Sequence, residues 1–376
     1  MKSFLDGFLK SAYFDAKAQS SGSHQHKPRH EQLNPRTLAT HPQLSPHWLS
    51  QLENIHVTPH KGAKRPSGSK VAMLDDRKVF LKCIDFTQTY SSAKHAFLED
   101  AVWIQALEHP HIVRVLGFTV VAYSTTFCVV LEFMEQGTLA SRLRSPTLFS
   151  GAVMSTSQYG GRRPPSNVAQ DEKLIAYQKC LELAIGLHYL HSQQIPYKVI
   201  SASNILVHDN QYKWNIQQLM RCRPKHCSRR GVVGAEGERY GTGDVVYAAP
   251  ELLSSTEPVD SFAADIYALA IVFGEIVTQT PPFANVYEAL GPVAGDAHVA
   301  TVKANPASSL EDLAPFLDWL PAEDVSTTTS TTTKGLSFEA LVRKCLDANP
   351  ASRPTIDLVV LALVPLAENP RFHVEP

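Results

Sequence analysis

The sequence lacks a surplus of charge of either sign. Lys and Arg together number 35 against 36 Asp and Glu over 376 residues, which gives a formal net charge of −1. A chain that binds nucleic acid or an anionic membrane through its overall field carries a marked basic excess. The charge balance excludes such a field, and we expect no nucleic-acid partner.

Cysteine is scarce, and its placement argues against a disulfide framework. Of the six cysteines, Cys83, Cys128 and Cys180 lie inside apolar stretches. Reduced thiols in a cytosolic core show this pattern. Cys222 and Cys227 lie close together in RCRPKHC, but no second ligand pair follows at zinc-finger spacing. The cysteines therefore favour an intracellular protein without a structural metal.

Long apolar runs are missing as well. No run approaches the ~18 residues that a membrane-spanning helix needs, so we expect no transmembrane segment. The 44% hydrophobic and 19% charged residues are typical of a soluble globular protein with a large core, built as one domain or two lobes. The expected location is cytoplasmic.

Residues 1–47 differ in composition from the rest of the chain. In SFLDGFLKSAYF, five apolar residues fall on one helical face: Phe4, Leu5, Phe8, Leu9 and Tyr13. The polar stretch that follows is rich in His and Pro and predicts a disordered linker, with a His-rich metal site as the alternative. An amphipathic helix plus linker is expected, with its own domain, a membrane or a partner protein as the surface on which the helix docks.

Two regions with different patterns of apolar residues follow residue 47. Residues 48–134 show short apolar strands around one helix in SSAKHAFLEDAVWIQALEH, whereas residues 135–368 contain two long stretches with apolar residues three and four apart. The pattern predicts an α+β fold in which a small β-rich lobe precedes a larger helical lobe. Two polar, low-complexity inserts near 145–170 and 291–335 are predicted to loop out of the second lobe, and 369–376 to form a tail.

Seven landmarks occur in order along these two regions. They are KVFLKC, HPHIVRVLGF, VVLEFMEQGTLASRL, GLHYLHSQQIPYKVISASNILV, YAAPELL, DIYALAIVFGEI and NPASRPT. The series resembles the eukaryotic protein kinase family and is most similar to its tyrosine-kinase-like branch. The resemblance covers residues 55–366. It implies a bilobal protein-kinase-like fold with helix C in the small lobe, and ATP with Mg²⁺ as the cofactor of an active member.

The resemblance also implies where a nucleotide would bind. Lys82 in KVFLKC is the counterpart of the ATP-binding lysine, and Asp100 takes the position of its partner on helix C, one methylene shorter than the family's Glu. Leu131 takes the gatekeeper position. The adenine edge would face the backbone of Glu132, Phe133 and Met134. Lys82 is interpreted either as a residual nucleotide anchor or as a lysine that stabilises the lobe through an ion pair.

The catalytic loop keeps its Asn but not the residues before it. The family pattern H-R-D-x-x-x-x-N supplies an Asp to the attacking hydroxyl and an Asn to a magnesium ion. Here Tyr197 and Lys198 take the His and Arg positions, Val199 takes the Asp position, and Asn204 remains. Val199 has no acceptor, and loss of a general base typically costs about 10²–10⁴-fold in rate. Asn204 is a candidate metal ligand only if Mg²⁺ binds.

The second magnesium position has changed too. YKWNIQQL occupies the strand that normally leads into D-F-G, and this register puts Ile216, Gln217 and Gln218 on those three positions. Ile216 cannot bind Mg²⁺, which prefers hard oxygen ligands. The phosphate-cradling loop is degraded as well, with three residues at glycine positions: Lys64, Pro66 and Ser69.

Residues with structural roles in the family are present. Glu251 in the A-P-E segment resembles the carboxylate that pairs with the Arg of the late turn, here Arg353. Asp265 resembles the helix F Asp that holds the backbone of the catalytic loop. The sequence thus predicts a kinase-like fold with its scaffold kept and its phosphate-transfer residues lost.

Three functions remain open at this point. The first is a pseudokinase that acts in signal transduction as a scaffold or allosteric regulator, with another kinase or a phosphoprotein as its protein partner. The second is an active ATP-dependent serine/threonine kinase with a rearranged site, and the third is a nucleotide-binding module without turnover. A basic run between residues 221 and 230 is either a solvated loop or a docking surface for an acidic or phosphorylated partner.

Overall fold

The computed structural model describes residues in the second of two units into which the chain divides, 1–34 and 35–376. The described residues are 38–39, 44–49, 69–87, 91–121, 124–143, 166–219, 244–254, 259–314 and 336–368. The expected N-terminal helix, most of its linker, the glycine-loop positions before Ser69, the basic run, Cys222, Cys227 and the tail lie outside them.

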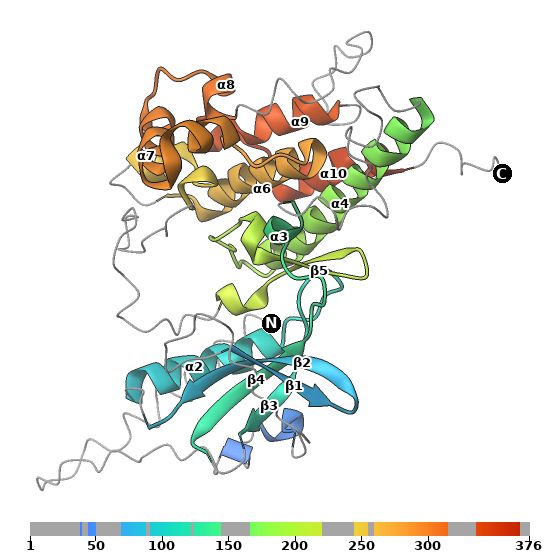
Figure 1. Cartoon of the computed structure of the whole chain (residues 1–376), viewed down its shortest axis with the longest axis vertical. Helices are drawn as coiled ribbons and strands as arrows, with labels where there is room; N and C mark the ends of the chain where they lie inside the picture. Colours follow the sequence, from blue (N-terminus) through green and yellow to red (C-terminus); the bar gives the residue numbers. More distant parts are fainter. Residues whose placement is uncertain are drawn as a thin grey trace, which may run out of the picture. The chain divides into compact units, whose positions relative to one another are not determined.

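The first described part is an antiparallel sheet with one long helix. The strands are β1 (Ser69–Leu74), β2 (Arg77–Asp85), β3 (Val115–Val120) and β4 (Thr126–Glu132), in the order β1-β2-β4-β3. Helix α2 (Ser91–Gln105) joins β2 to β3 and lies beside the sheet in Figure 1. The helix predicted in this region is confirmed.

Alternation along the strands explains how the sheet is buried on both faces. Leu81 and Cys83 of β2 pack with Cys128 and Val130 of β4 on one face, as the two-residue period of a strand requires. On the other face, Phe127 meets Phe97 of α2 edge-on, with ring centroids 5.9 Å apart. The sheet is therefore a fixed support for any side chain that β2 or β4 carries.

Two hairpins turn through pairs of residues with positive φ. Asp75 and Asp76 join β1 to β2 with φ of 46° and 61°. Asp209 and Asn210 join β5 (Ile205–His208) to β6 (Gln211–Trp214) with φ of 46° and 60°. Asp and Asn tolerate this region better than most residues, and the twist of such turns suits a two-residue hairpin.

The second described part is mostly helical, as Figure 1 shows. Its helices are α3 (Leu139–Leu143), α4 (Ser166–Ser192), α5 (Pro250–Ser254), α6 (Ser261–Thr278), α7 (Ala284–Ala304), α8 (Leu310–Leu313), α9 (Phe338–Cys345) and α10 (Ile356–Ala367). Short 3₁₀ helices are η2 (Ser45–His47), η5 (Ala202–Asn204), η6 (Ile216–Leu219), η8 (Asp244–Val246) and η11 (Pro350–Ser352). A sheet followed by a helical part confirms the predicted α+β fold.

Helix α6 is the centre of this helical part. Asp260 caps its N-terminus by accepting hydrogen bonds from the N–H groups of Phe262 and Ala263 at 2.9 and 3.3 Å.

By length and composition α6 could cross a membrane, contrary to the expectation that no segment approaches that size. Its most apolar window is 72% buried within the fold, as in the core helix of a globular domain.

The expected insert at 291–335 is wrong for its first part. Residues 291–304 continue α7 beyond a kink at Gly291, which has a φ of 73°. Pro292 is the next residue. The Gly-Pro pair looks like a loop signal, but the following Ala-rich stretch has high helix propensity and buries Val299. Residues 166–170 likewise belong to α4 and not to an insert.

Candidate functional site

Asp265 of α6 organises the loop at Tyr197 and Lys198. Its carboxylate accepts from Tyr197 N at 2.6 Å and from Lys198 N at 2.8 Å. His191 Nε2 at the end of α4 lies 3.0 Å from the same carboxylate. Lys198 has a φ of 67°, a left-handed conformation that needs support from its surroundings. The three contacts fix the direction of the chain as it enters the loop.

Tyr197 is a brace within this loop. Its hydroxyl donates to the carbonyl oxygens of Asn215 at 2.9 Å and Asn204 at 3.3 Å, and its ring lies 4.9 Å from that of Trp214. Burial raises the pKa of the Tyr197 phenol, so the hydroxyl stays protonated. The sequence pattern identified Tyr197 only as the residue at the position of the family's His. It did not reveal this role, because the fold brings the two carbonyl groups to the hydroxyl.

The rest of the loop keeps its shape without a side-chain acceptor at residue 199. Asn204 Nδ2 donates to the carbonyl oxygen of Val199 at 2.6 Å, which closes the turn through η5. The Asn204 amide nitrogen therefore stabilises the loop itself. The Val199 side chain offers only methyl groups, so it can neither orient a hydroxyl nor take its proton.

Ile216 lies at the position where the resemblance expects a carboxylate. The side chain is 0% exposed at the start of η6. Ahead of it, Asn215 Oδ1 accepts from Gln217 N at 3.2 Å and fixes the turn into η6. The position is therefore part of the apolar core.

These residues do not fit a magnesium ion. Mg²⁺ requires several hard oxygen ligands in near-octahedral geometry. Of the two ligand positions, one holds Asn204, whose amide supplies a single neutral oxygen, and the other holds buried Ile216, which supplies none. Within the ranges that the structure describes, no group of three or more His, Cys, Asp or Glu side chains could hold a metal.

The residues assigned to the nucleotide lie on two elements of the small lobe. Lys82 is in β2, where it pairs with Val129 of β4. Asp100 lies in α2 and is 1% exposed. Both Lys82 and Asp100 have interaction partners. A carboxylate buried to this extent needs a cation or a hydrogen-bond donor. These facts leave open both the nucleotide anchor and the structural ion pair for Lys82.

The expected adenine edge carries an ion pair that sequence reasoning missed. Lys213 Nζ of β6 lies 2.8 and 2.9 Å from the two carboxylate oxygens of Glu132, and Arg114 N donates to Oε1 at 2.8 Å. Leu131 and Met134 are buried, and the Lys78 ammonium lies 5.9 Å from the centroid of the Phe133 ring. Glu132 thus links the end of β4 to the β5–β6 hairpin through its side chain.

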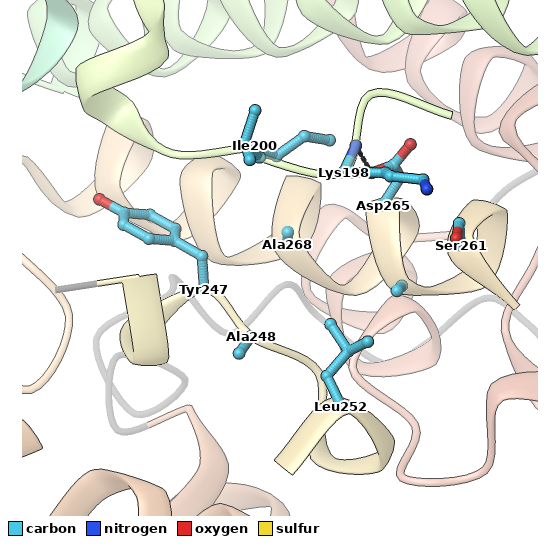
Figure 2. A pocket seen from close by; sticks show the side chains of 10 residues that line it. Lys198, Ile200, Tyr247, Ala248, Leu252, Ser261, Asp265 and Ala268 are labelled. Carbon is cyan, nitrogen blue, oxygen red and sulfur yellow. Dashed lines mark hydrogen bonds between the residues drawn. The ribbon is translucent and has the colours of Figure 1, made fainter. Parts of the chain in front are cut away.

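A pocket lies beside the loop. Figure 2 shows Lys198 and Ile200 on one side, Tyr247, Ala248 and Leu252 on the other, and α6 with Asp265 between them. Val199 also lines it. Most of the lining residues are apolar, and Lys198, Ser261 and Asp265 add polar groups. With a volume of about 20 Å³ the pocket admits only a small group such as a methyl.

Glu251 and Arg353 form a buried, bidentate ion pair. The two guanidinium nitrogens lie 2.7 Å from the two carboxylate oxygens, and the side chains are 12% and 0% exposed. Arg353 also donates to the carbonyls of Asp347 at 2.8 Å and Ala263 at 3.0 Å. The pair joins α5, α6 and the turn before α10, so it anchors the segment that follows the pocket.

The sequence of this chain is similar to those of known proteins. The family model of the protein kinase domain matches residues 68–362. The chain is 26% identical to a putative serine/threonine-protein kinase/receptor R826 of Acanthamoeba polyphaga mimivirus over 60% of its length and 11% of that protein. It is 26% identical to human receptor-interacting serine/threonine-protein kinase 1 over 69% and 33%.

A third relative is a mitogen-activated protein kinase kinase kinase 3 of Arabidopsis thaliana, 29% identical over 58% of this chain and 28% of that protein. The chain therefore spans a third or less of the length of these three relatives. The family model, in contrast, covers most of the chain. The chain belongs to the protein kinase family.

Proposed function

We propose that this chain is a pseudokinase of the tyrosine-kinase-like branch. It acts in the cytoplasm as a scaffold or allosteric regulator, and its partner is another kinase or a phosphoprotein. Two of the relatives are serine/threonine kinases by name, and the third is a mitogen-activated protein kinase kinase kinase. The proposal is that this chain keeps their fold and has lost the residues for phosphate transfer. Function depends on the site and not on the fold alone.

The observation that carries the proposal is the complete burial of Ile216 at the metal position. Phosphoryl transfer depends on positioning and on metal ions that neutralise charge on the phosphates. A hydrocarbon side chain in the core cannot supply a ligand, and Val199 removes the general base independently. The two losses act on separate parts of the transition state, so a single compensating group does not restore both.

The preserved scaffold supports a binding role. Asp265 holds the loop in one conformation, and the Glu251–Arg353 pair anchors the segment behind the pocket. A mostly apolar pocket with rigid walls can accept a small side chain of a partner protein without the entropy cost of ordering a loop.

An active serine/threonine kinase is the second candidate. It is favoured by the presence of Lys82 in β2 and Asn204 in the loop. On this candidate Lys82 would hold ATP and a ligand from outside the described residues would complete the metal site. The two candidates differ in one measurable quantity, the incorporation of phosphate.

The test is a phosphotransfer assay with radiolabelled ATP, Mg²⁺ and myelin basic protein as acceptor. We expect the natural chain and Lys82→Ala to give the same background. The matched control is Lys78→Ala, which removes an exposed lysine from the same strand. Incorporation that is lost in Lys82→Ala and kept in Lys78→Ala would contradict the proposal and establish the active kinase.

A further inference from the structure

One lysine lies in the core of the helical part. Lys303, the penultimate residue of α7, is 2% exposed. Its ammonium donates to the carbonyl oxygen of Val246 and, at 3.0 Å, to that of Ala248. Both acceptors belong to one short loop, 246–248, which is separated from Lys303 by more than fifty residues of sequence.

Two aromatic rings also lie near the Lys303 ammonium. The ammonium lies 4.9 Å from the centroid of the Tyr267 ring and 5.6 Å from that of Phe283. Burial lowers the pKa of Lys303 well below its ordinary value, and the nearby Glu251 carboxylate opposes that shift. A buried cation is costly unless its donors are satisfied. Its hydrogen-bond partners therefore indicate its role, and both are carbonyls of the same loop.

That loop forms one wall of the pocket. Tyr247 and Ala248 line it opposite Lys198 and Ile200, as Figure 2 shows. Tyr247 points its hydroxyl toward α6, where it donates to Glu275 Oε1 at 3.2 Å. The opposite wall is fixed by Asp265 through the backbone of residues 197 and 198. Each wall is thus held by one buried charged side chain.

We propose that Lys303 is a positioning residue that holds loop 246–248 in the shape that forms the pocket. The loop is anchored from within the folded helical part through two of its own carbonyls. A partner that inserts a small apolar side chain then meets a pocket whose walls are already in place. The use of the pocket by a partner rests on the proposed function, whereas the role of Lys303 in shaping the loop does not.

Hydrogen exchange followed by mass spectrometry tests this on the full chain. Lys303→Met keeps the unbranched stem but removes the donors. We expect peptides covering residues 245–250 to exchange at least tenfold faster in this variant, while peptides from α6 keep their protection. The matched control is Lys344→Met, the same change at an exposed lysine near the end of α9, which should alter neither region.

Two results would overturn the proposal. Unchanged exchange in residues 245–250 would mean that the loop holds its shape without Lys303. Equal acceleration in the loop and in α6 would mean that Lys303 stabilises the whole helical part and not the loop. If Lys303→Met is not recovered folded, Lys303→Leu, which also lacks the donors, is measured against the same two results. Exchange in this loop is independent of phosphate transfer, so a failure here is distinct from a failure of the pseudokinase proposal.

Discussion

Replacing Asp265 by Ala should destabilise the protein more than any surface substitution on the same helix. The carboxylate accepts from two backbone N–H groups, at 2.6 and 2.8 Å, inside the fold. Hydrogen bonds to a charged acceptor contribute about 1.5–3 kcal/mol each, and the orphaned donors stay buried. We therefore expect Asp265→Ala to lower the free energy of unfolding by about 3–6 kcal/mol.

The assay is urea unfolding followed by circular dichroism, with a thermal melt beside it. With an unfolding entropy of about 2.1 cal/mol/K per residue, a domain of about 300 residues shifts by roughly 1.6 °C per kcal/mol, so the melting temperature should fall by at least about 5 °C. Asp260→Ala is the matched control, because it removes a carboxylate from the exposed N-cap of the same helix. Loss of a cap costs about 1 kcal/mol. The reasoning is refuted if Asp265→Ala costs no more than Asp260→Ala.

Three further outcomes follow from the same contacts. Arg353→Leu strands the Glu251 carboxylate, whose side chain is 12% exposed, and should lower the free energy of unfolding by about 3–5 kcal/mol in urea. Tyr197→Phe removes the hydroxyl that donates to two carbonyls and should cost about 1–3 kcal/mol in the same assay, without a change in the m-value. Burial lowers the pKa of both His109 and His111, so the unfolded chain binds more protons below about pH 6.5. The free energy of unfolding should therefore fall as the pH is lowered from 7.5 through 6.5 toward 5.5, as measured by urea titrations at each pH.

Each outcome has a result that would contradict it. Arg114→Leu breaks an ion pair with Glu108 whose side chains are 64% and 77% exposed; such a pair contributes at most about 1 kcal/mol. An Arg353→Leu cost as small as that would be inconsistent with a buried pair. An unchanged free energy of unfolding in Tyr197→Phe would show that the hydroxyl does not stabilise the loop. A free energy of unfolding that stays constant or rises on acidification would show that the two histidines are not neutral in the folded state.

The sequence predicted the parts of the fold that depend on local pattern. Period-two alternation identified the strand region, and apolar spacing of three and four identified α4 and α6, because both signals lie within one segment. The Glu251–Arg353 contact was predicted from the family resemblance and not from local pattern. These residues are 102 positions apart, and only the resemblance to a family with such a pair put them together.

Lys303 and Tyr197 show what local pattern could not predict. A lysine at the C-terminal end of a helix is expected in solvent, where it complements the helix dipole. Lys303 is buried because two carbonyls of a distant loop meet it. Tyr197 likewise takes its role from carbonyls that the fold brings to its hydroxyl. In both cases the partner is a backbone atom, and side-chain patterns carry no signal for it.

The kink in α7 shows that a local break signal does not by itself end a helix. Gly291 and Pro292 do interrupt helical geometry. The helix resumes directly after Gly291, because the residues that follow favour helix and bury Val299 and Lys303 against the fold. Tertiary packing decided whether a break became a loop.

We expect the site not to bind a metal–nucleotide complex. A thermal-shift titration of the full chain with ATP, with and without Mg²⁺, measures this directly, because a ligand that binds only the folded state raises the melting temperature by mass action. We expect Mg²⁺ to add nothing to the shift that ATP alone produces. A shift that requires Mg²⁺ and disappears in Lys82→Ala would contradict it.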